Sequence, residues 1–374
     1  MMTVPPPFAD LRRRPDIESR ELRAWDAADS LILDEASLLI PGSSLVVIGD
    51  SYGALTLGAI QAGASEVRVH QDPLLGELAL AANAREVGVE DGRFRSMPLE
   101  PQLLDGATLV LLRLPRSLAA LDEISALIAA NASPEVVVVA GGRLKHMTVT
   151  MNDVLVRHFA RIDVSHARQK SRLLLARWPL PAAPVSPWRE WHEELGLEVV
   201  ASGGVFAGAS LDLGTRALVG VLDQLPPHRL PTARRGIDLG CGTGILAAAL
   251  AKRDPSARVL ATDQSASAVT SARLTMAANG LDVEVVRDHG LSREPDESAD
   301  LVLLNPPFHT GAAVHPGLAQ KMFEDAARVL RPGGELWTVW NSHLGYRPHL
   351  ERIVGRTRQI ARGPKFTVTA SIRA

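Results

Sequence analysis

The chain has 374 residues, of which 46% are hydrophobic and 22% charged, and its formal net charge is −2 at pH 7. These values are those of an ordinary globular protein, and at about 100–200 residues per domain the length predicts two domains or three. A single cysteine excludes an intramolecular disulfide, and the lack of a secretory signal pattern or of ~18 continuous apolar residues favours a cytoplasmic protein without membrane association.

The first half of the chain alternates short apolar runs with helical runs, which predicts a parallel sheet with both faces covered. A proline- and arginine-rich stretch at 1–20 is predicted to be a tail, and the first domain is expected to span 21–178. Strands are predicted at 46–48, 67–72, 107–112 and 135–139. A glycine turn follows the first strand, between Gly49 and Gly53.

Basic residues gather late in this half. The segment from Arg143 to Arg189 contains nine lysines and arginines and only two acidic residues, so its net charge is about +7. Such a cluster can bind the phosphates of a nucleic-acid backbone even on a protein whose net charge is negative. A solvated face is the alternative interpretation. Arg168, Lys170 and Arg172 are the candidate contacts to nucleic acid.

Residues 179–204 are predicted to be a linker, because four prolines between 179 and 187 favour a stiff connector. The second domain is expected at 205–374, with a lead-in helix at 214–224. Its strands are predicted at 237–239, 259–263, 283–286, 299–304 and 335–340. Its other helices are predicted at 245–252, 266–279 and 318–330.

The two halves repeat one pattern at a shift of about 191 residues. The same elements recur in the same order in both halves: a glycine turn, a strand that ends in an acidic residue, a helix and the later strands. We therefore expect an internal duplication with two tandem Rossmann-like α/β domains. The copies differ where chemistry would occur. Val47 replaces Asp238, Ser51 replaces Gly242, and Arg-Leu-Pro-Arg at 113–116 replaces Asn-Pro-Pro-Phe at 305–308. The first copy is therefore predicted to be inactive and kept for binding or support.

The glycine turn of the second half carries a candidate cofactor site. Gly240, Gly242 and Gly244 let the backbone turn sharply and approach a ligand closely. The third glycine falls one place too early for a dinucleotide fingerprint, and Asp238 suits a cationic ligand better than a pyrophosphate. S-adenosylmethionine (SAM) is such a ligand. A structural strand-to-helix turn is the alternative.

Two further acids follow the next strands. Asp263 ends the second strand, where a carboxylate can accept both hydroxyls of a ribose; its alternative role is a helix N-cap. Asp288 follows the third strand and is placed for an adenine amino group.

Asn305-Pro306-Pro307-Phe308 follows the fourth strand. The prolines fix the backbone, so the Asn305 side-chain oxygen and the Pro306 carbonyl become two acceptors for one exocyclic amine. Held in this way, the nitrogen lone pair leaves conjugation with the base and points at the methyl donor, while Phe308 stacks on a flipped base. His309 is a candidate substrate contact. The alternative is a rigid turn that ends the strand.

These motifs resemble the class I methyltransferases that act on amino groups. Within them, the Phe-His ending and the degenerate first copy resemble the bacterial tandem-domain ribosomal RNA guanine-N2 methyltransferases, whose two branches act on 16S and 23S rRNA. The 23S branch is favoured by softer similarities in four segments, 22–29, 49–55, 145–148 and 341–346. The resemblance covers nearly the whole chain.

The resemblance implies a role for each matching residue. SAM would be held by Asp238, Gly240 and Asp263, with Asp288 at the adenine. Asn305 and the Pro306 carbonyl would hold the guanine amine. The first copy would bind or position ribosomal RNA, and a monomer without a metal is expected. The 16S enzyme, a DNA-adenine or protein-glutamine methyltransferase, a nucleotide-dependent oxidoreductase and a non-catalytic RNA-binding scaffold are the alternatives.

Overall fold

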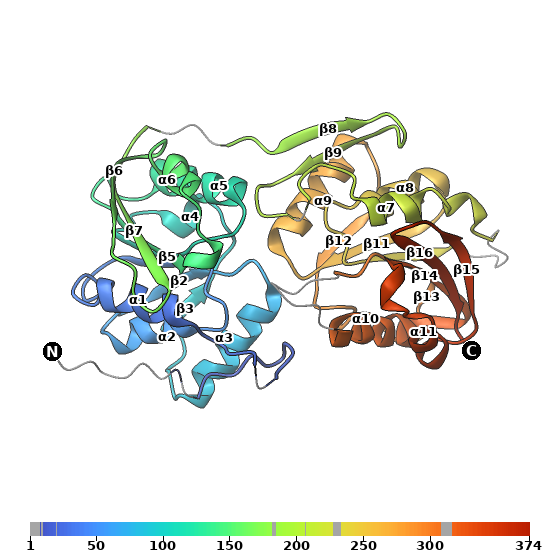
Figure 1. Cartoon of the computed structure of the whole chain (residues 1–374), viewed down its shortest axis with the longest axis horizontal. Coiled ribbons are helices and arrows are strands. Elements are labelled where there is room, and N and C mark those ends of the chain that lie inside the picture. The colour runs from blue at the N-terminus through green and yellow to red at the C-terminus, as the bar shows by residue number, and fades with distance from the viewer. Residues whose placement is uncertain are drawn as a thin grey trace. The chain divides into compact units, whose positions relative to one another are not determined.

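The computed structural model describes residues 8, 10–19, 21–181, 185–205, 207–226, 233–307 and 316–374. The chain divides into two compact units, Met1–Ser186 and Pro187–Ala374 (Figure 1). No helix in the described ranges is long and apolar enough to cross a membrane. Each unit is an α/β layer structure, as predicted.

The first unit contains a seven-stranded sheet in the order β3-β2-β1-β4-β5-β7-β6. Its strands are β1 (Leu45–Ile48), β2 (Val67–His70), β3 (Phe94–Ser96), β4 (Leu109–Arg113), β5 (Val137–Arg143), β6 (Phe159–Val164) and β7 (Ser171–Pro179). The first five run parallel, and β7 pairs antiparallel with both β5 and β6. Its helices are α1 (Ala27–Ala36), α2 (Ala54–Gln61), α3 (Leu74–Glu86), α4 (Pro101–Leu104), α5 (Leu118–Asn131) and α6 (Thr150–Leu155).

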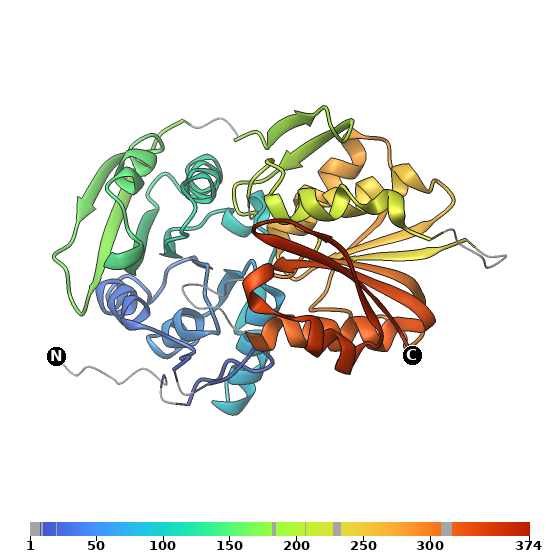
Figure 2. The same cartoon turned by 45° about the vertical axis from the view of Figure 1, so that its right-hand side comes forward.

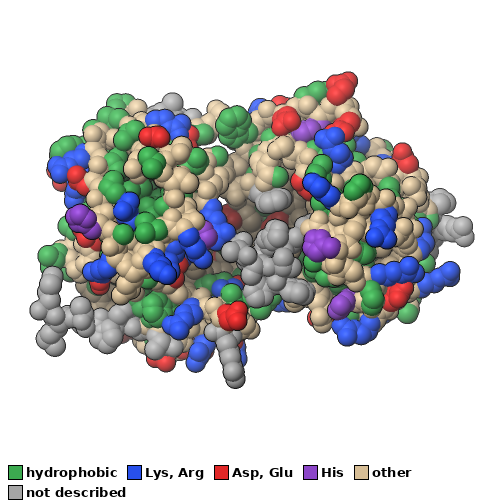
Figure 3. Space-filling model, in the orientation of Figure 1, with side chains coloured by type: hydrophobic (Ala, Val, Ile, Leu, Met, Phe, Trp, Pro, Cys, Tyr) green, Lys and Arg blue, Asp and Glu red, His purple; other side chains and the backbone are tan. Residues whose placement is uncertain are grey.

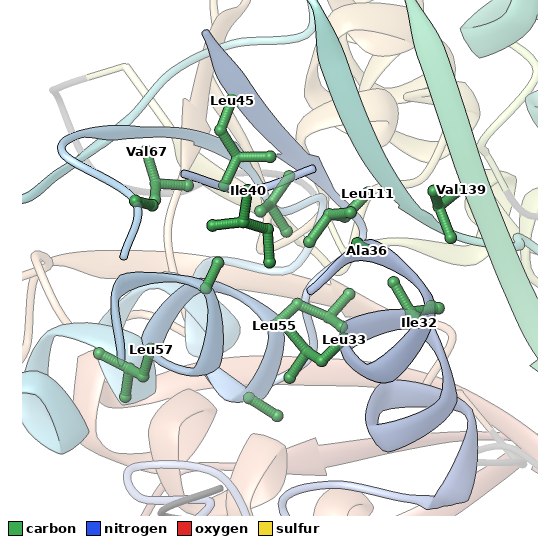
Figure 4. Packing of buried hydrophobic residues seen from close by; sticks show 14 of the residues in the cluster. Ile32, Leu33, Ala36, Ile40, Leu45, Leu55, Leu57, Val67, Leu111 and Val139 are labelled. Atoms are coloured by element: carbon green, nitrogen blue, oxygen red, sulfur yellow. The ribbon is translucent and has the colours of Figure 1, made fainter. Parts of the chain in front are cut away.

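The central strands of this sheet are buried on both faces. In β1, Leu45 and Val47 belong to one apolar cluster and Val46 and Ile48 to another, because successive side chains of a strand point to opposite faces. Figure 4 shows the first cluster, in which helix residues such as Ile32 pack beneath the strands. Burial on both faces explains the unbroken apolar runs of the sequence.

The second unit repeats the same topology, with the order β12-β11-β10-β13-β14-β16-β15. Its strands are β10 (Arg235–Leu239), β11 (Arg258–Asp263), β12 (Glu284–Arg287), β13 (Ala299–Leu304), β14 (Leu330–Asn341), β15 (Thr357–Arg362) and β16 (Phe366–Ile372). Its helices are α7 (Leu213–Val219), α8 (Ile245–Arg253), α9 (Ala266–Ala278), α10 (Pro316–Val329) and α11 (Arg347–Ile353). Figure 2 shows α7 and α8 on one face of the sheet and α10 and α11 on the other. The matching strand orders support the predicted duplication.

Residues 188–201, within the predicted linker at 179–204, form regular structure, which differs from the prediction. They contain β8 (Trp188–His192) and β9 (Leu197–Ala201), which form an antiparallel hairpin. The backbone N–H groups of residues 198, 200 and 202 donate to the side chains of Asn279, Thr275 and Ser271 at 3.0 Å each. Since these three side chains lie four residues apart along and just after α9, one helix face satisfies the open edge of β9.

The predicted tail at 1–20 also contains ordered residues. The rings of Phe8 and Trp25 stack with centroids 4.7 Å apart, and Leu11 is buried. The side chain of Asn83, on α3, accepts from the Arg12 backbone N–H and donates to its carbonyl, both at 2.9 Å. Asn279 makes the same reciprocal pair with Glu198 in the second unit. The predicted tail and linker therefore dock on their units in the same way.

Candidate active site

The candidate site lies where four parallel strands of the second unit end. Leu239 of β10 is the register partner of both Thr262 of β11 and Leu304 of β13, and Asp263 is the partner of Arg287 of β12. The glycine turn, Asp263, Asp288 and Asn305 consequently share one edge of the sheet. The strand order reverses between β10 and β13, and such a switch point is where open α/β sheets bind ligands.

The glycine turn leads from β10 into α8. Gly242 has φ +54° and Gly244 has φ +81°, a backbone region that side chains other than glycine rarely adopt. A Cβ at Gly244 would lie 2.7 Å from Cε of Met276, so this glycine also allows α8 to approach α9. A Cβ at Gly242 would meet no atom within 4 Å, which leaves open space above the turn.

Asp238 is fully buried beneath this turn. Its Oδ2 accepts a hydrogen bond from the Ala247 backbone N–H at 2.9 Å, and its Oδ1 has no hydrogen-bond partner within the described part of the chain. Burial, helped by the nearby charge of Asp263, raises the pKa of Asp238 to about 7. A buried carboxylate oxygen with nothing to bind is suited to receive a donor or a cationic group.

Asp263 ties the turn to the neighbouring strand. Its Oδ2 accepts from the Gly242 N–H at 3.0 Å and its Oδ1 from the Ser265 N–H at 2.9 Å. These two bonds hold the Asp263 carboxylate against the glycine turn and the start of α9. The N-cap of α9 is Ser265, so the alternative role of Asp263 as that cap is wrong.

Asp288 is buried and holds its own loop. Its Oδ1 accepts from the His289 N–H at 2.8 Å and from the Ser292 hydroxyl at 2.5 Å, and its Oδ2 accepts from the Arg293 N–H at 3.1 Å. The Asp288 backbone N–H donates to the Asp263 carbonyl at 3.0 Å. Asp288 therefore fixes the loop beside Asp263.

Asn305 is half-buried directly after β13. Its Nδ2 donates to Asp212 Oδ1 at 3.2 Å and to Thr215 Oγ1 at 3.0 Å, while its Oδ1 is buried and has no partner among the residues described. Pro306 is buried and Pro307 is exposed. The predicted roles of Phe308 and His309 fall on residues outside the described ranges.

The sequence analysis did not identify Asp212, which precedes α7, or Thr215, the third residue of that helix. Asp212 is the N-cap of this helix and accepts from the N–H groups of Gly214 at 2.9 Å and Thr215 at 3.1 Å. The first copy contains a pattern that could have indicated these residues, because Asp26 and Asp29 occupy the N-cap and the third position of α1. Comparing the halves at a shift of 186 residues would have aligned the two pairs.

Two polar side chains at the corresponding edge of the first unit, Asp50 and Arg113, have partners within that unit. Asp50, in the turn after β1, accepts from three backbone N–H groups, those of Gly53, Leu55 and Thr56. Arg113, which occupies the place of Asn305, forms ion pairs with Asp26 and with Asp29. Where the second unit has the unpaired acceptor of Asn305, the first unit thus has an arginine that is paired with two aspartates.

The candidate RNA residues lie at the β6–β7 hairpin of the first unit. Arg168 and Lys170 are exposed and Arg172 is half-buried; Arg168 forms an ion pair with Asp34. Gln169 and Lys170, the two central residues of the turn, have φ +51° and +59°, which side chains other than glycine adopt at a cost. Figure 3 shows lysine and arginine side chains over the visible face of this unit.

Comparison with known proteins places both units. A family model described as "RLMG N-terminal domain" matches residues 2–179, and one described as "Methyltransferase small domain" matches residues 196–370. The "Ribosomal RNA large subunit methyltransferase G" of Ectopseudomonas mendocina is 38% identical over 370 residues, which cover 97% of each chain. Its counterpart in Streptomyces coelicolor is 37% identical over 386 residues, which cover 100% of each. The chain belongs to the ribosomal RNA large subunit methyltransferase G family.

Membership of the ribosomal RNA large subunit methyltransferase G family confirms the resemblance that the sequence indicated, including its large-subunit branch. As a member, the chain is a SAM-dependent methyltransferase, and the oxidoreductase and scaffold alternatives are wrong. Among solved structures, the 16S rRNA N2 methyltransferase of T. thermophilus, in complex with AdoMet and guanosine, aligns with a TM-score of 0.75 and 21% identity. It covers 93% of this chain and 92% of that chain, and confirms the predicted tandem Rossmann-like fold.

Proposed function

We propose that this enzyme methylates the exocyclic N2 amine of a guanine in 23S ribosomal RNA. The observation that carries the proposal is the buried, unpartnered Oδ1 of Asn305 at the same sheet edge as the unpartnered Oδ1 of Asp238, as far as the described residues reach. An unpaired buried acceptor costs about 1–3 kcal/mol, so each of these oxygens favours an incoming donor or cation. The names of the relatives favour 23S over 16S rRNA.

The residues present fit SAM, which supplies the methyl group when bound. Asp238 is a buried carboxylate suited to the cationic amino-acid portion, and the space above Gly242 lets a ligand approach the backbone. Gly240 and Gly244 complete the turn. We assign the ribose hydroxyls to Asp263. The loop that Asp288 fixes is assigned to the adenine.

Asn305 would act on the base. Its Oδ1 accepts one N–H of the guanine amine and the Pro306 carbonyl accepts the other, so the nitrogen lone pair turns out of the ring and becomes nucleophilic. Pro307 stiffens this corner, and we assign stacking of the flipped base to Phe308 and a further contact to His309. No strong base has to act first, because the proton can leave after the methyl group has transferred.

The first unit would bind the RNA. We assign phosphate contacts to Arg168, Lys170 and Arg172, of which the first two are exposed at a hairpin tip. Since ribosomal RNA is the substrate, we place the enzyme in the cytoplasm, and we propose that it acts as a monomer. Sedimentation of the full chain with and without RNA tests the last point.

Asn305→Ala tests the catalytic assignment. Removing a contact made in the transition state lowers turnover rather than cofactor affinity, so kcat is expected to fall about 100- to 1,000-fold while the Kd for SAM stays within about threefold. Labelled methyl transfer to separated 23S and 16S rRNA from a deletion strain gives kcat, and calorimetry gives the Kd. The matched control is Asn131→Ala on α5, an asparagine whose side chain donates to the Leu127 carbonyl of its own helix at 2.8 Å.

Two outcomes would contradict the proposal. A wild-type kcat for Asn305→Ala would show that Asn305 has no catalytic role. Label that enters 16S rRNA alone, or a digestion product other than N2-methylguanosine, would show that the substrate assignment is wrong.

A further inference from the structure

Three atoms around the Asn305 amide fix which way it points. Asp212 Oδ1 and Thr215 Oγ1 both receive hydrogen bonds from Nδ2, and Asp212 Oδ2 lies 3.5 Å from the same nitrogen. Carboxylate oxygens accept hydrogen bonds and cannot donate them. A reversed amide would therefore place two acceptor oxygens about as close as the 3.2 Å that now separates Nδ2 from Asp212 Oδ1, with no hydrogen between them.

This orientation decides where the acceptor of Asn305 lies. With Nδ2 committed to Asp212 and Thr215, Oδ1 is turned away from them and is buried without a partner in the described ranges. A Cβ at Gly214 would lie 3.0 Å from Oδ1 and 3.2 Å from Nδ2, so the missing side chain of Gly214 leaves the room that the amide occupies. The segment Asp212–Thr215 thus shapes both the direction and the space of the amide.

The first copy keeps the same arrangement around a different residue. Asp26 and Asp29, at the N-cap and third position of α1, hold Arg113, and Ala28 stands where the second copy has glycine. A guanidinium has donors and no acceptor, so this copy has nothing to offer an amine. The two copies therefore share the polar residues at the start of the helix. They differ in the residue that these hold, which offers a free acceptor only in the second copy.

We propose that Asp212, Thr215 and Gly214 are positioning residues that act through Asn305: they hold its amide with Oδ1 free to accept an N–H of the substrate amine. The inference rests on the proposed function, since it specifies how that site selects a donor nitrogen. Both hydrogen bonds are formed before substrate arrives, so the acceptor is preorganised.

Asp212→Asn is the sharpest test. Asparagine has the same shape and remains a good N-cap, so α7 is retained. It also brings an NH2 group, which favours the reversed amide of Asn305. In single-turnover methyl transfer with the full chain and 23S rRNA, the rate is expected to fall about five- to tenfold, the worth of one hydrogen bond, with the Kd values for SAM and RNA unchanged. Asp26→Asn in the first copy is the matched control and keeps the wild-type rate.

A double-mutant cycle separates positioning from a general structural effect. If Asp212 acts through Asn305, Asp212→Asn has no further effect on the rate in an Asn305→Ala background. Thr215→Val is expected to lower the rate as Asp212→Asn does, and Thr215→Ser to restore it, because only the hydroxyl matters. Gly214→Ala is expected to lower the rate although alanine favours a helix.

The outcomes distinguish this inference from the proposed function. If Asn305→Ala abolishes methylation while Asp212→Asn and Thr215→Val both keep the wild-type rate, the positioning role is refuted and the proposed function stands. Equal rate losses from Asp212→Asn in the wild-type and Asn305→Ala backgrounds also refute it. Full activity of Asn305→Ala refutes the proposed function itself.

Discussion

Replacing Asp238 by asparagine should stabilise the ligand-free enzyme while weakening SAM binding. The side chain is fully buried, accepts from the Ala247 N–H, and leaves its other oxygen unpaired among the described residues. Asparagine keeps the first contact and removes the buried charge. The pKa of Asp238 is raised from 3.8 to about 7, so the folded protein binds this proton more tightly than the unfolded chain does.

The sign of the effect follows from that shift. A raised carboxyl pKa contributes stability that is fully present below the unfolded pKa of about 4 and is lost as the pH rises through about 7. A shift of ~3 units corresponds to at most ~4 kcal/mol at 1.36 kcal/mol per unit. We expect Asp238→Asn to raise the free energy of unfolding by about 1–3 kcal/mol at pH 8 and by about half as much at pH 5.5, midway between the two pKa values.

Calorimetric melting of the full chain checks the expectation. For a unit of this size a gain of 1 kcal/mol moves the Tm by about 2–4 °C. Asp282→Asn, an exposed aspartate of the same unit, is the control and should leave the Tm unchanged. The Kd for SAM should rise at least about tenfold, because the carboxylate partner of a cation is lost. A lower Tm at pH 8, or an equal gain at both pH values, would refute the reasoning.

Three further predictions concern other parts of the chain. Arg113→Met should cost the first unit about 3–5 kcal/mol, because it leaves a buried aspartate without its partner; a Tm within 1 °C of wild type, about what a fraction of a kcal/mol gives, would contradict this. Replacing Arg168, Lys170 and Arg172 together by alanine should reduce the slope of log K against log salt concentration by about 2, at ~0.7 per lost contact to single-stranded RNA. An unchanged slope in filter binding would show that the hairpin does not contact the RNA. Gly242→Ala should weaken SAM binding because its Cβ enters the open space above the turn, and calorimetry showing an unchanged Kd would exclude a ligand there.

The catalytic half of the fold follows closely from local sequence. The predicted strand at 299–304 coincides with β13, and the predicted helix at 266–279 differs from α9 by its last residue. Such elements carry their own signals, which are apolar runs, a glycine turn and caps. Residues 331–334, which follow the predicted helix at 318–330 and have the turn-favouring sequence Arg-Pro-Gly-Gly, lie instead inside β14, where the register with β13 shifts between Ala299 and Leu301. The pairing with β13 and β16 outweighs the local turn preference there.

The missed features depend on contacts between distant residues. Residues 1–20 were interpreted as a tail because nothing local shows that Arg12 pairs with Asn83. The helix at 214–224 is shorter than predicted, since α7 ends at Val219 and a short 3-10 turn follows at Leu222–Gln224. Asp212 could be interpreted as a helix cap from its position alone, but its bond to Asn305 spans 93 residues. The candidate site was therefore predicted as a set of acceptors without the groups that orient them.

The pairing of β9 with α9 determines where the catalytic unit can be cut. A fragment that began at residue 205 would lack β9, and the side chains of Ser271, Thr275 and Asn279 would face water along a helix that evolved to meet a backbone. Such a fragment would also expose the apolar surface that Leu197 and Val199 cover. Anyone who wishes to study methyl transfer without the first unit should start the polypeptide at Pro187 or earlier.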